Sequence, residues 1–308
     1  MKLVQVPEVF TVPKRLEENG TTILYRWQPV AHVIDEDLFI RVLIQLVKGI
    51  GKGNRTIQTS YNAQFLGKAS KHLEIMNDKF ELGLSKNDCI EMSWIESILY
   101  IGGYPENTPP EVLLERKTNI KDSFKAKSDF VKKPIPESGL EGLWKLFLEE
   151  DVPYSIWNPF GGMMGRISES EIPYPRRKVI MFMIQYLTSW LGDDMESGRK
   201  HFEWIRKEYE YMADYASKYP RQAYVNNRDL DLGIMRTTPV PATLAVPRIK
   251  RNSLQIILGN PRVTGSAKKV LVKEIELITL RSQAHLLHQL GHPYGCHVFS
   301  IYSMSRVY

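Results

Sequence analysis

The sequence has very little cysteine and no long uninterrupted apolar run. Two cysteines among 308 residues, Cys89 and Cys296, are too few for a disulfide framework, so each is expected to be a free thiol. The most apolar stretches, 38–47 and 179–190, are interrupted by arginine or glutamine and are too short to cross a bilayer as helices. We therefore expect no membrane partner and no fold held together by disulfides.

Signals for export and for metal binding are also scarce. The first ten residues contain one lysine and no apolar core, so they do not resemble a signal peptide, and the chain as written is not addressed for secretion. Metal-ligating residue types gather only near the C-terminus, at His285, His288, His292, Cys296 and His297. Because glycines and a proline in 291–295 would break a helix there, we predict no metal site.

The chain has no net positive charge outside its last quarter. The net charge is +6, but residues 234–308 hold 10 Lys and Arg against 2 Asp and Glu, which leaves 31 against 33 in residues 1–233. The basic segment shows no aromatic residues interleaved on a defined face, as a nucleic-acid site would. We therefore expect no nucleic-acid partner.

Hydrophobic periodicity predicts a mixture of strands and helices. Alternating apolar positions predict strands at 35–48, 56–66, 123–131, 154–159 and 179–190. Apolar residues three and four apart predict helices at 68–80, 137–150 and 193–217. Glycines in 49–53 indicate a hairpin between the first two strands. The pattern predicts an α+β fold, an antiparallel β-sheet covered by helices, whereas residues 234–308 follow no sustained period.

Eight short strings in residues 1–233 carry a family resemblance. They are EDLFIRV (36–42), FLGKAS (65–70), DCIEMSWIESILY (88–100), KSDFVKKPIP (127–136), GLEGLWK (139–145), NPFGGMM (158–164), ISESEIPYPRR (167–177) and NNRDLDLG (226–233). In this order they resemble the berberine bridge enzyme-like (reticuline oxidase-like) family of plant FAD-linked oxidoreductases. The resemblance implies FAD as cofactor, hydride transfer from a small-molecule substrate to the flavin, and reoxidation by O2.

The resemblance also implies a domain organisation. Residues 1–233 are similar to the substrate-binding domain of a vanillyl-alcohol-oxidase-type flavoprotein, and 234–308 would be an atypical basic tail, poorly ordered. No glycine-rich phosphate loop and no flavin-attachment motif occurs in the sequence, so we expect a truncated chain without the FAD domain, inactive alone. Residues 234–308 match no segment of the family. A shifted reading frame or a retained intron is our hypothesis for this difference.

Substrate class and location follow from the family alone. The substrate would be an alkaloid, a phenolic or a carbohydrate, and the location secreted, in the cell wall or in the vacuole. A function of another class stays open: a non-enzymatic binding or remnant protein that holds an apolar aromatic ligand.

Candidate catalytic and flavin-contacting residues lie in two segments. Met183 and Gln185 are two apart in a predicted strand, so they share one face, and the resemblance places them at the catalytic site. Alternatively, Met183 fills the core and the backbone satisfies Gln185. In the second segment Tyr224 and Asn226 match residues near the flavin. Asn227 stands where relatives often carry a Tyr base, and an amide has no ionisable proton near neutral pH.

The remaining candidates line the substrate pocket by resemblance: Gln58, Tyr61, Trp157 and Asn158. Aromatic residues at strand spacing are also typical of plain core. The nearby charges Arg228, Asp229 and Asp231 are predicted to form a structural ion-pair cluster rather than a catalytic group. Two further acids, Glu169 and Glu171, fall in a polar loop and are predicted to be solvated.

Overall fold

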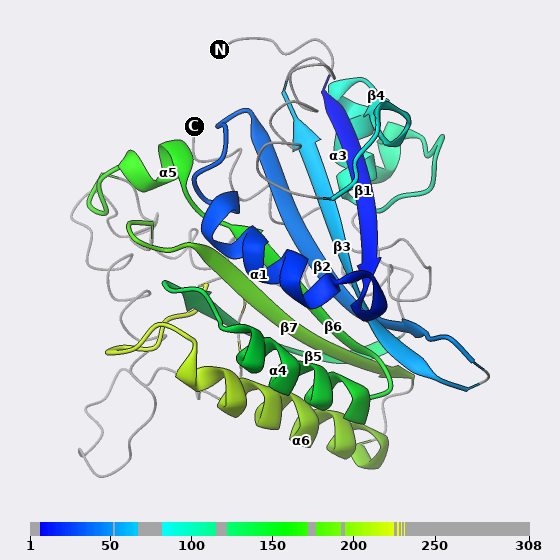
Figure 1. The fold of residues 1–308 in the computed structure, drawn as a ribbon, viewed down its shortest axis with the longest axis vertical. Coiled ribbons are helices and arrows are strands. Elements are labelled where there is room, and N and C mark those ends of the chain that lie inside the picture. Colours follow the sequence, from blue (N-terminus) through cyan, green and yellow to red (C-terminus); the bar gives the residue numbers. More distant parts are fainter. Residues whose placement is uncertain are drawn as a thin grey trace.

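The computed structural model contains one seven-stranded sheet with helices on both of its faces (Figure 1). It describes residues 7–51, 53–66, 82–114, 122–171, 177–191, 195–224, 227, 229 and 231. The strand order is β4-β1-β3-β2-β6-β7-β5, and each of these pairings is antiparallel. The predicted fold class, an antiparallel sheet covered by helices, is therefore confirmed.

The strands are β1 (Glu8–Arg15), β2 (Leu38–Lys48), β3 (Arg55–Phe65), β4 (Ile90–Glu91), β5 (Asp122–Val131), β6 (Pro153–Pro159) and β7 (Phe182–Leu191). The α-helices are α1 (Gly20–Ala31), α3 (Trp94–Ile101), α4 (Glu137–Glu149), α5 (Gly162–Arg166) and α6 (Met195–Tyr211). Short 3-10 turns lie at Leu16–Glu18, Lys86–Asp88, Pro110–Leu114 and Met212–Asp214. No helix in the described part of the chain is long and apolar enough to span a membrane.

A tight hairpin joins β2 to β3, as the glycines indicated. The Gly49 amide donates to the Asn54 carbonyl over 2.8 Å, and Gly51 and Gly53 have φ values of 96° and 84°. Such positive φ values suit glycine, which has no Cβ to clash with the backbone. The hairpin fixes an 11-residue register that runs from Lys48 opposite Arg55 to Leu38 opposite Phe65.

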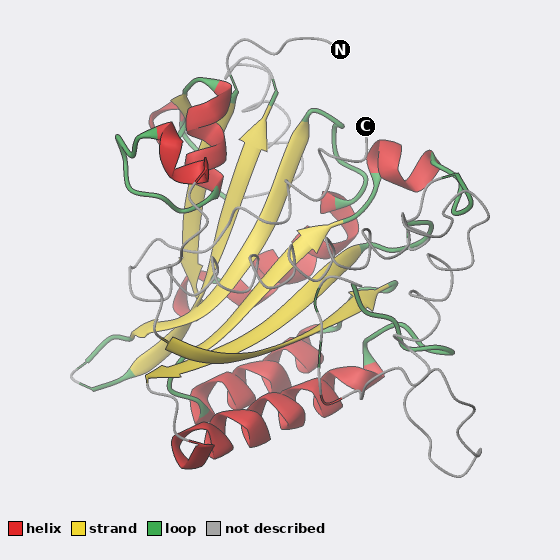
Figure 2. Cartoon of the chain, turned by 180° about the vertical axis from the view of Figure 1, so that it is seen from behind, coloured by secondary structure: helices red, strands yellow, loops and turns green. Residues whose placement is uncertain are grey.

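The two faces of the sheet differ in what covers them. Helices α1, α4 and α6 lie over one face, which we call the helix face (Figure 1). We call the opposite face, seen from behind in Figure 2, the site face; among the described helices α3 packs on it, beside β1 and β3. The Arg41 guanidinium and the Gln64 amide of this face donate to the Ile101 carbonyl and to the Ser97 hydroxyl of α3.

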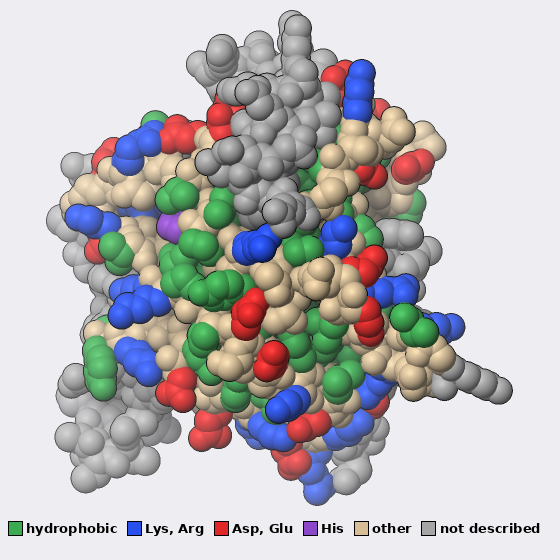
Figure 3. Space-filling view, viewed as in Figure 1, with side chains coloured by type: hydrophobic (Ala, Val, Ile, Leu, Met, Phe, Trp, Pro, Cys, Tyr) green, Lys and Arg blue, Asp and Glu red, His purple; other side chains and the backbone are tan. Residues whose placement is uncertain are grey.

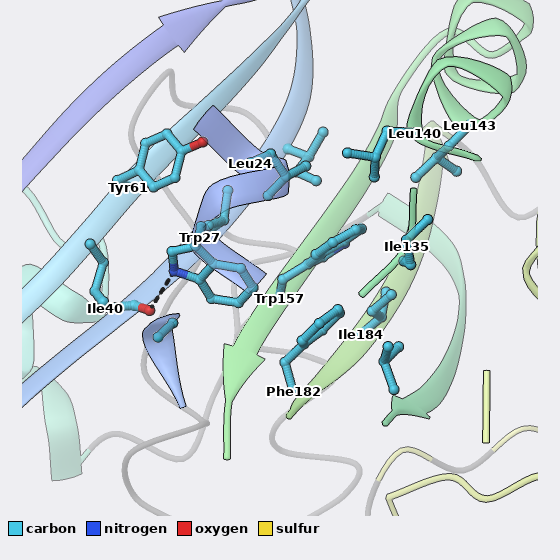
Figure 4. Close-up of a cluster of buried hydrophobic side chains, with 14 of the residues drawn as sticks. Leu24, Trp27, Ile40, Tyr61, Ile135, Leu140, Leu143, Trp157, Phe182 and Ile184 are labelled. Atoms are coloured by element: carbon cyan, nitrogen blue, oxygen red, sulfur yellow. Dashed lines mark hydrogen bonds between the residues drawn. The ribbon is translucent and has the colours of Figure 1, made fainter. Parts of the chain in front are cut away.

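The main core lies between the helix face and its three helices (Figure 4). At its centre Trp27 of α1 is fully buried and donates from Nε1 to the Ile40 carbonyl over 3.1 Å. Helix α4 contributes the apolar face that its spacing predicted, with Leu140, Leu143 and Phe147 fully buried. On the outer surface of this side, acidic and basic side chains alternate over α6, at the bottom of Figure 3.

Most predicted elements are present with shifted ends. The last predicted strand begins at Phe182 rather than at 179, and the last helix covers Met195–Tyr211 and continues as a 3-10 turn. The predicted helix 68–80 and the basic tail 234–308 lie outside the described residues. Helix α1, which contains Pro29, was not predicted.

Candidate active site

Strand pairing brings three of the predicted site residues together on the site face. Met183 of β7 lies opposite Asn158 of β6, and Gln185 is the next site-face residue along β7. The neighbouring strand β5 places Phe130 beside Met183 and Ser128 beside Gln185. The predicted common face of Met183 and Gln185 is confirmed, because the intervening Ile184 points into the helix-face core.

Polar atoms at the centre of this group lack partners. Asn158 is 1% exposed and Ser128 is 2% exposed, yet the Asn158 Oδ1 atom and the Ser128 hydroxyl make no hydrogen bond within the described part of the chain. Gln185 is buried beside them, with 9% of its surface exposed. The alternative interpretation, in which the backbone satisfies Gln185, stays a prediction. Buried polar groups without partners are uncommon, and a ligand-binding role is one explanation for them.

Apolar side chains flank these polar groups on two sides. One cluster contains Leu43, Ala126, Tyr154, Ile156 and Leu187. The other contains Phe130, Phe160, Ile180 and Met183, and the Tyr224 side chain packs against it. The Phe130 and Phe160 rings meet edge to face at 5.5 Å. An aromatic ligand with polar edges would find apolar contacts for its ring and hydrogen-bonding groups beside it.

The second predicted segment reaches the same place. The Asn227 side-chain nitrogen lies 4.0 Å from the sulfur of Met183, and the Asn227 amide donates to the Tyr224 carbonyl over 3.0 Å. Tyr224, Asn227 and Met183 therefore come together, as the resemblance implied. Asn226 lies outside the described residues.

The four predicted pocket residues lie on two different faces of the sheet, and Asn158, described above, is on the site face. Gln58 is on the site face, half-buried, and donates from its amide to the Ser60 hydroxyl over 3.2 Å. Tyr61 and Trp157 instead belong to the helix-face core, where both are fully buried (Figure 4). Burial raises the pKa of the Tyr61 phenol above its ordinary value.

Trp157 is packed as a core residue. Its ring stacks on Phe182 at 5.0 Å with an interplanar angle of 11°, and Trp27 meets the same phenylalanine edge to face at 5.4 Å. The Trp157 Nε1 group donates to the Ser155 hydroxyl over 3.0 Å. The structure does not bring Tyr61 to Gln58 or Trp157 to Asn158. Tyr61 is three positions from Gln58 and Trp157 is one position from Asn158, and side chains an odd number of positions apart in a strand point to opposite faces.

The acidic residues beyond Asn227 are held in an ion-pair cluster on the helix face. Asp229 accepts from Lys125 at 2.8 Å and from Lys127 at 2.6 Å, and Asp231 lies near the same two lysines and Arg206. Burial raises the pKa of Asp229, but the two lysines outweigh burial and lower it overall. The predicted structural role of Asp229 and Asp231 fits this arrangement, and Arg228 lies outside the described residues.

Sequence reasoning missed a second ion pair. Asp129 of β5 accepts a bidentate interaction from Arg221, over 2.6 Å to Nε, and a hydrogen bond from the Tyr186 hydroxyl over 3.1 Å. Burial raises the pKa of Asp129 to about 6, against the opposing effects of Arg221, Tyr186 and Lys127. The alternation of Lys125, Lys127 and Asp129 in an otherwise apolar strand was the signal that could have indicated a charged stripe.

The other acidic candidates show no site. Glu169 and Glu171 are exposed, as predicted. Among the described residues no group of three or more His, Cys, Asp or Glu side chains could hold a metal ion. The C-terminal histidines and Cys296 lie outside the described part of the chain.

Comparison with known proteins identifies relatives over the same region. The chain is 55% identical over 239 residues to monolignol oxidoreductase AtBBE-like 13 of Arabidopsis thaliana, which covers 76% of this chain and 45% of that protein. It is 56% identical over 239 residues to berberine bridge enzyme-like 26 of the same plant, over 76% of this chain and 44% of the relative. The chain thus spans about half the length of the curated relatives it matches.

Solved structures share the fold. BBE-like #28 from Arabidopsis thaliana matches with a TM-score of 0.72 at 30% identity, over 88% of this chain and 55% of that one. The grass pollen allergen Phl p 4, which has glucose dehydrogenase activity, matches with a TM-score of 0.70 at 28% identity, over 88% and 53%. No family model matches the sequence. The high identity to curated relatives, together with the shared fold, shows that this chain belongs to the berberine bridge enzyme-like family.

Proposed function

We propose that the site face forms the substrate-side wall of a FAD-dependent active site that oxidises a phenolic alcohol. The observation that carries the proposal is the group of buried polar side chains, Ser128, Asn158 and Gln185, between two apolar clusters; the Ser128 hydroxyl and the Asn158 Oδ1 atom have no hydrogen-bond partner among the described residues. A relative at 55% identity is named a monolignol oxidoreductase, which supports a phenolic allylic alcohol as the substrate class.

The residues present fit a flavin and an aromatic substrate. The aromatic and aliphatic side chains around Met183 suit the faces of flat rings, and the buried amides of Asn158 and Gln185 suit their polar edges. When bound, a flavin accepts a hydride and passes the electrons to O2. The contribution of this chain is to bind the alcohol, orient it and take up its hydroxyl proton.

The chemistry of the side chains divides these tasks. Gln185 offers both a donor and an acceptor and is assigned to the substrate hydroxyl. Oxidation to the aldehyde removes a hydride from the carbinol carbon and a proton from the hydroxyl oxygen. Neither Met183 nor Asn227 can accept that proton, so Tyr224 beside them is assigned to proton transfer: its side chain takes the hydroxyl proton as a phenolate and becomes the neutral phenol.

A chimera tests the proposal. The matched region of monolignol oxidoreductase AtBBE-like 13 is replaced by the homologous residues of this chain, and aldehyde formation from coniferyl alcohol is measured. Turnover is expected, with losses of about 10²-fold or more for Gln185→Leu and Tyr224→Phe. A folded, flavin-containing chimera without turnover on phenolic alcohols, or one indifferent to both substitutions, would contradict the proposal.

The purified 308-residue chain gives a complementary result. Because its sequence contains no glycine-rich phosphate loop, the chain alone is expected to be colourless and to lack turnover. A yellow protein that retains flavin through gel filtration would overturn that expectation.

A second candidate function is ligand binding without turnover. Asn227 favours it, since this amide stands where relatives often carry a Tyr base. Under this hypothesis coniferyl alcohol raises the melting temperature of the 308-residue chain, while the chimera binds the alcohol without oxidising it. Aldehyde formation by the chimera excludes this second candidate.

A further inference from the structure

The chain before Tyr224 is fastened to β5 by backbone hydrogen bonds and by an ion pair on the helix face. The Ser217 amide donates to the Phe130 carbonyl over 2.7 Å, and the Phe130 amide donates to the Gln222 carbonyl over 3.2 Å. Between them Arg221 forks onto Asp129, and its guanidinium carbon lies 3.4 Å from the centre of the Tyr209 ring. A bidentate pair stacked on an aromatic ring fixes both the position and the orientation of Arg221.

The chain after Asn227 is fastened to the same strand a second time. Asp229 lies between the ammonium groups of Lys125 and Lys127, with side chains 10% and 3% exposed, and is itself 2% exposed at its side chain. Its Oδ1 atom also accepts the Asp231 amide over 3.1 Å. Lys127 in turn stands 4.8 Å from the centre of the Tyr209 ring.

The described residues between the two anchors lie on the other face of the sheet. Tyr224 packs against Phe130 and Met183, and Asn227 reaches the sulfur of Met183. The chain therefore passes around the edge of β5, from Arg221 on the helix face to Tyr224 and Asn227 on the site face, and returns to Asp229 on the helix face. Because β5 is the outermost strand of the sheet, this edge is available for the passage.

We propose that Lys125, Lys127 and Asp129 are positioning residues, which hold Tyr224 and Asn227 against Met183 by anchoring Arg221 and Asp229 on the opposite face of β5. The three alternate along one strand, so a single rigid element sets both anchor points. The inference rests on the proposed function only for the role of Tyr224 in binding and turnover; the anchoring itself is a property of the fold.

The buried ion pairs that Lys125, Lys127 and Asp129 form are better suited to positioning the chain than to increasing the overall stability of the fold. Desolvation offsets much of the attraction in a buried ion pair, so apolar side chains of similar size would support folding as well. Charged and forked hydrogen bonds instead admit one geometry, which a catalytic segment requires. The anchoring ion pairs lie on the helix face, so they act on the site through the chain between them.

Amide hydrogen exchange of the full 308-residue chain tests the proposal. The variants are Asp229→Asn, Lys127→Met and their combination. The matched control is Lys200→Met, which removes an ion pair to Asp151 whose side chains are 58% and 64% exposed. Exchange at the amides of Tyr224 and Asn227 is expected to be roughly tenfold to hundredfold faster in each anchor variant and unchanged in the control. The two substitutions are expected to be non-additive, because they remove the same contact.

Two outcomes would overturn the positioning role. One is exchange at Tyr224 and Asn227 no faster than in the Lys200→Met control. The other is acceleration spread equally over β2, β3 and this segment, which would indicate a general loss of stability. A parallel thermal-shift measurement of coniferyl alcohol binding distinguishes failure of the proposed substrate from failure of the proposed anchoring. Weaker binding in Asp229→Asn than in the unsubstituted chain supports both proposals. If the unsubstituted chain does not bind the alcohol, the proposed substrate fails, while the exchange result still decides the anchoring.

Discussion

Replacement of Trp157 distinguishes a core residue from a pocket residue. The side chain is fully buried, stacks on Phe182 and donates to the Ser155 hydroxyl. Removal of a buried tryptophan to alanine costs about 3–5 kcal/mol of unfolding free energy. For a domain of this size each kcal/mol lowers the melting temperature by about 2–4 °C, so Trp157→Ala is expected to lower it by roughly 6–20 °C.

A milder variant covers the case in which the alanine protein does not fold. Trp157→Phe keeps an aromatic ring against Phe182 and is expected to cost about 1–2 kcal/mol from the area lost. The control is the next residue in β6, Asn158→Ala, which faces the other side and removes an oxygen that has no partner among the described residues. Its stability is expected to change by less than about 1 kcal/mol.

Urea unfolding followed by far-UV circular dichroism measures the stability of each variant, and coniferyl alcohol binding is measured under conditions where the variant is folded. Trp157→Phe is expected to shift the unfolding midpoint and to retain binding of coniferyl alcohol. Asn158→Ala is expected to leave the midpoint nearly unchanged and to weaken binding. The assignment of Trp157 to the core is refuted if its substitution leaves the midpoint unchanged and abolishes binding.

Three further predictions concern stability and reactivity. Burial, with added repulsion from Glu150 and Asp129, raises the pKa of Glu208 well above its ordinary value. Between the unfolded pKa and the raised folded pKa, the folded state loses about 1.4 kcal/mol of stability per pH unit, so Glu208→Gln should raise the melting temperature near pH 8 and leave it unchanged near pH 4. An equal effect at both values would contradict the buried neutral acid. Ser93 is the N-cap residue of α3, and its hydroxyl accepts from the Glu96 amide, so Ser93→Ala should lower the free energy of unfolding in urea by about 0.5–2 kcal/mol. Burial and the neighbouring Glu8 raise the pKa of the Cys89 thiol to about 12. In a Cys296→Ser background it should react with a disulfide reagent near pH 8 at least about tenfold more slowly than in the unfolded chain, and equal rates would contradict this.

Strand periodicity predicted the sheet because its signal is local. The alternation around Met183 and Gln185 identified both the strand and the shared face, and the glycines of 49–53 identified the hairpin. The same alternation already places Gln58 and Tyr61 on different faces of the sheet, and it does the same for Trp157 and Asn158. The alternation does not say which face the helices cover. The family resemblance alone therefore assigned residues of both faces to one pocket.

Other features depend on contacts that no local pattern contains. Asp129 and Arg221 are 92 residues apart, and their pairing requires the chain to pass around the edge of β5. Helix α1 was missed because Pro29, a helix breaker, lies inside it. Packing of Trp27 into the main core, and the bond from Gln28 to the backbone of Ile135, support that helix where its own propensity does not.

Anaerobic mixing of the flavin-containing chimera with coniferyl alcohol tests the central claim, that the site face binds the substrate beside the flavin. The visible flavin absorbance is expected to bleach in a single turnover, because the alcohol transfers a hydride. Bleaching should be lost in Gln185→Leu on the site face and retained in Tyr61→Phe on the helix face. Loss in Tyr61→Phe with retention in Gln185→Leu would show that the reaction does not take place at the site face.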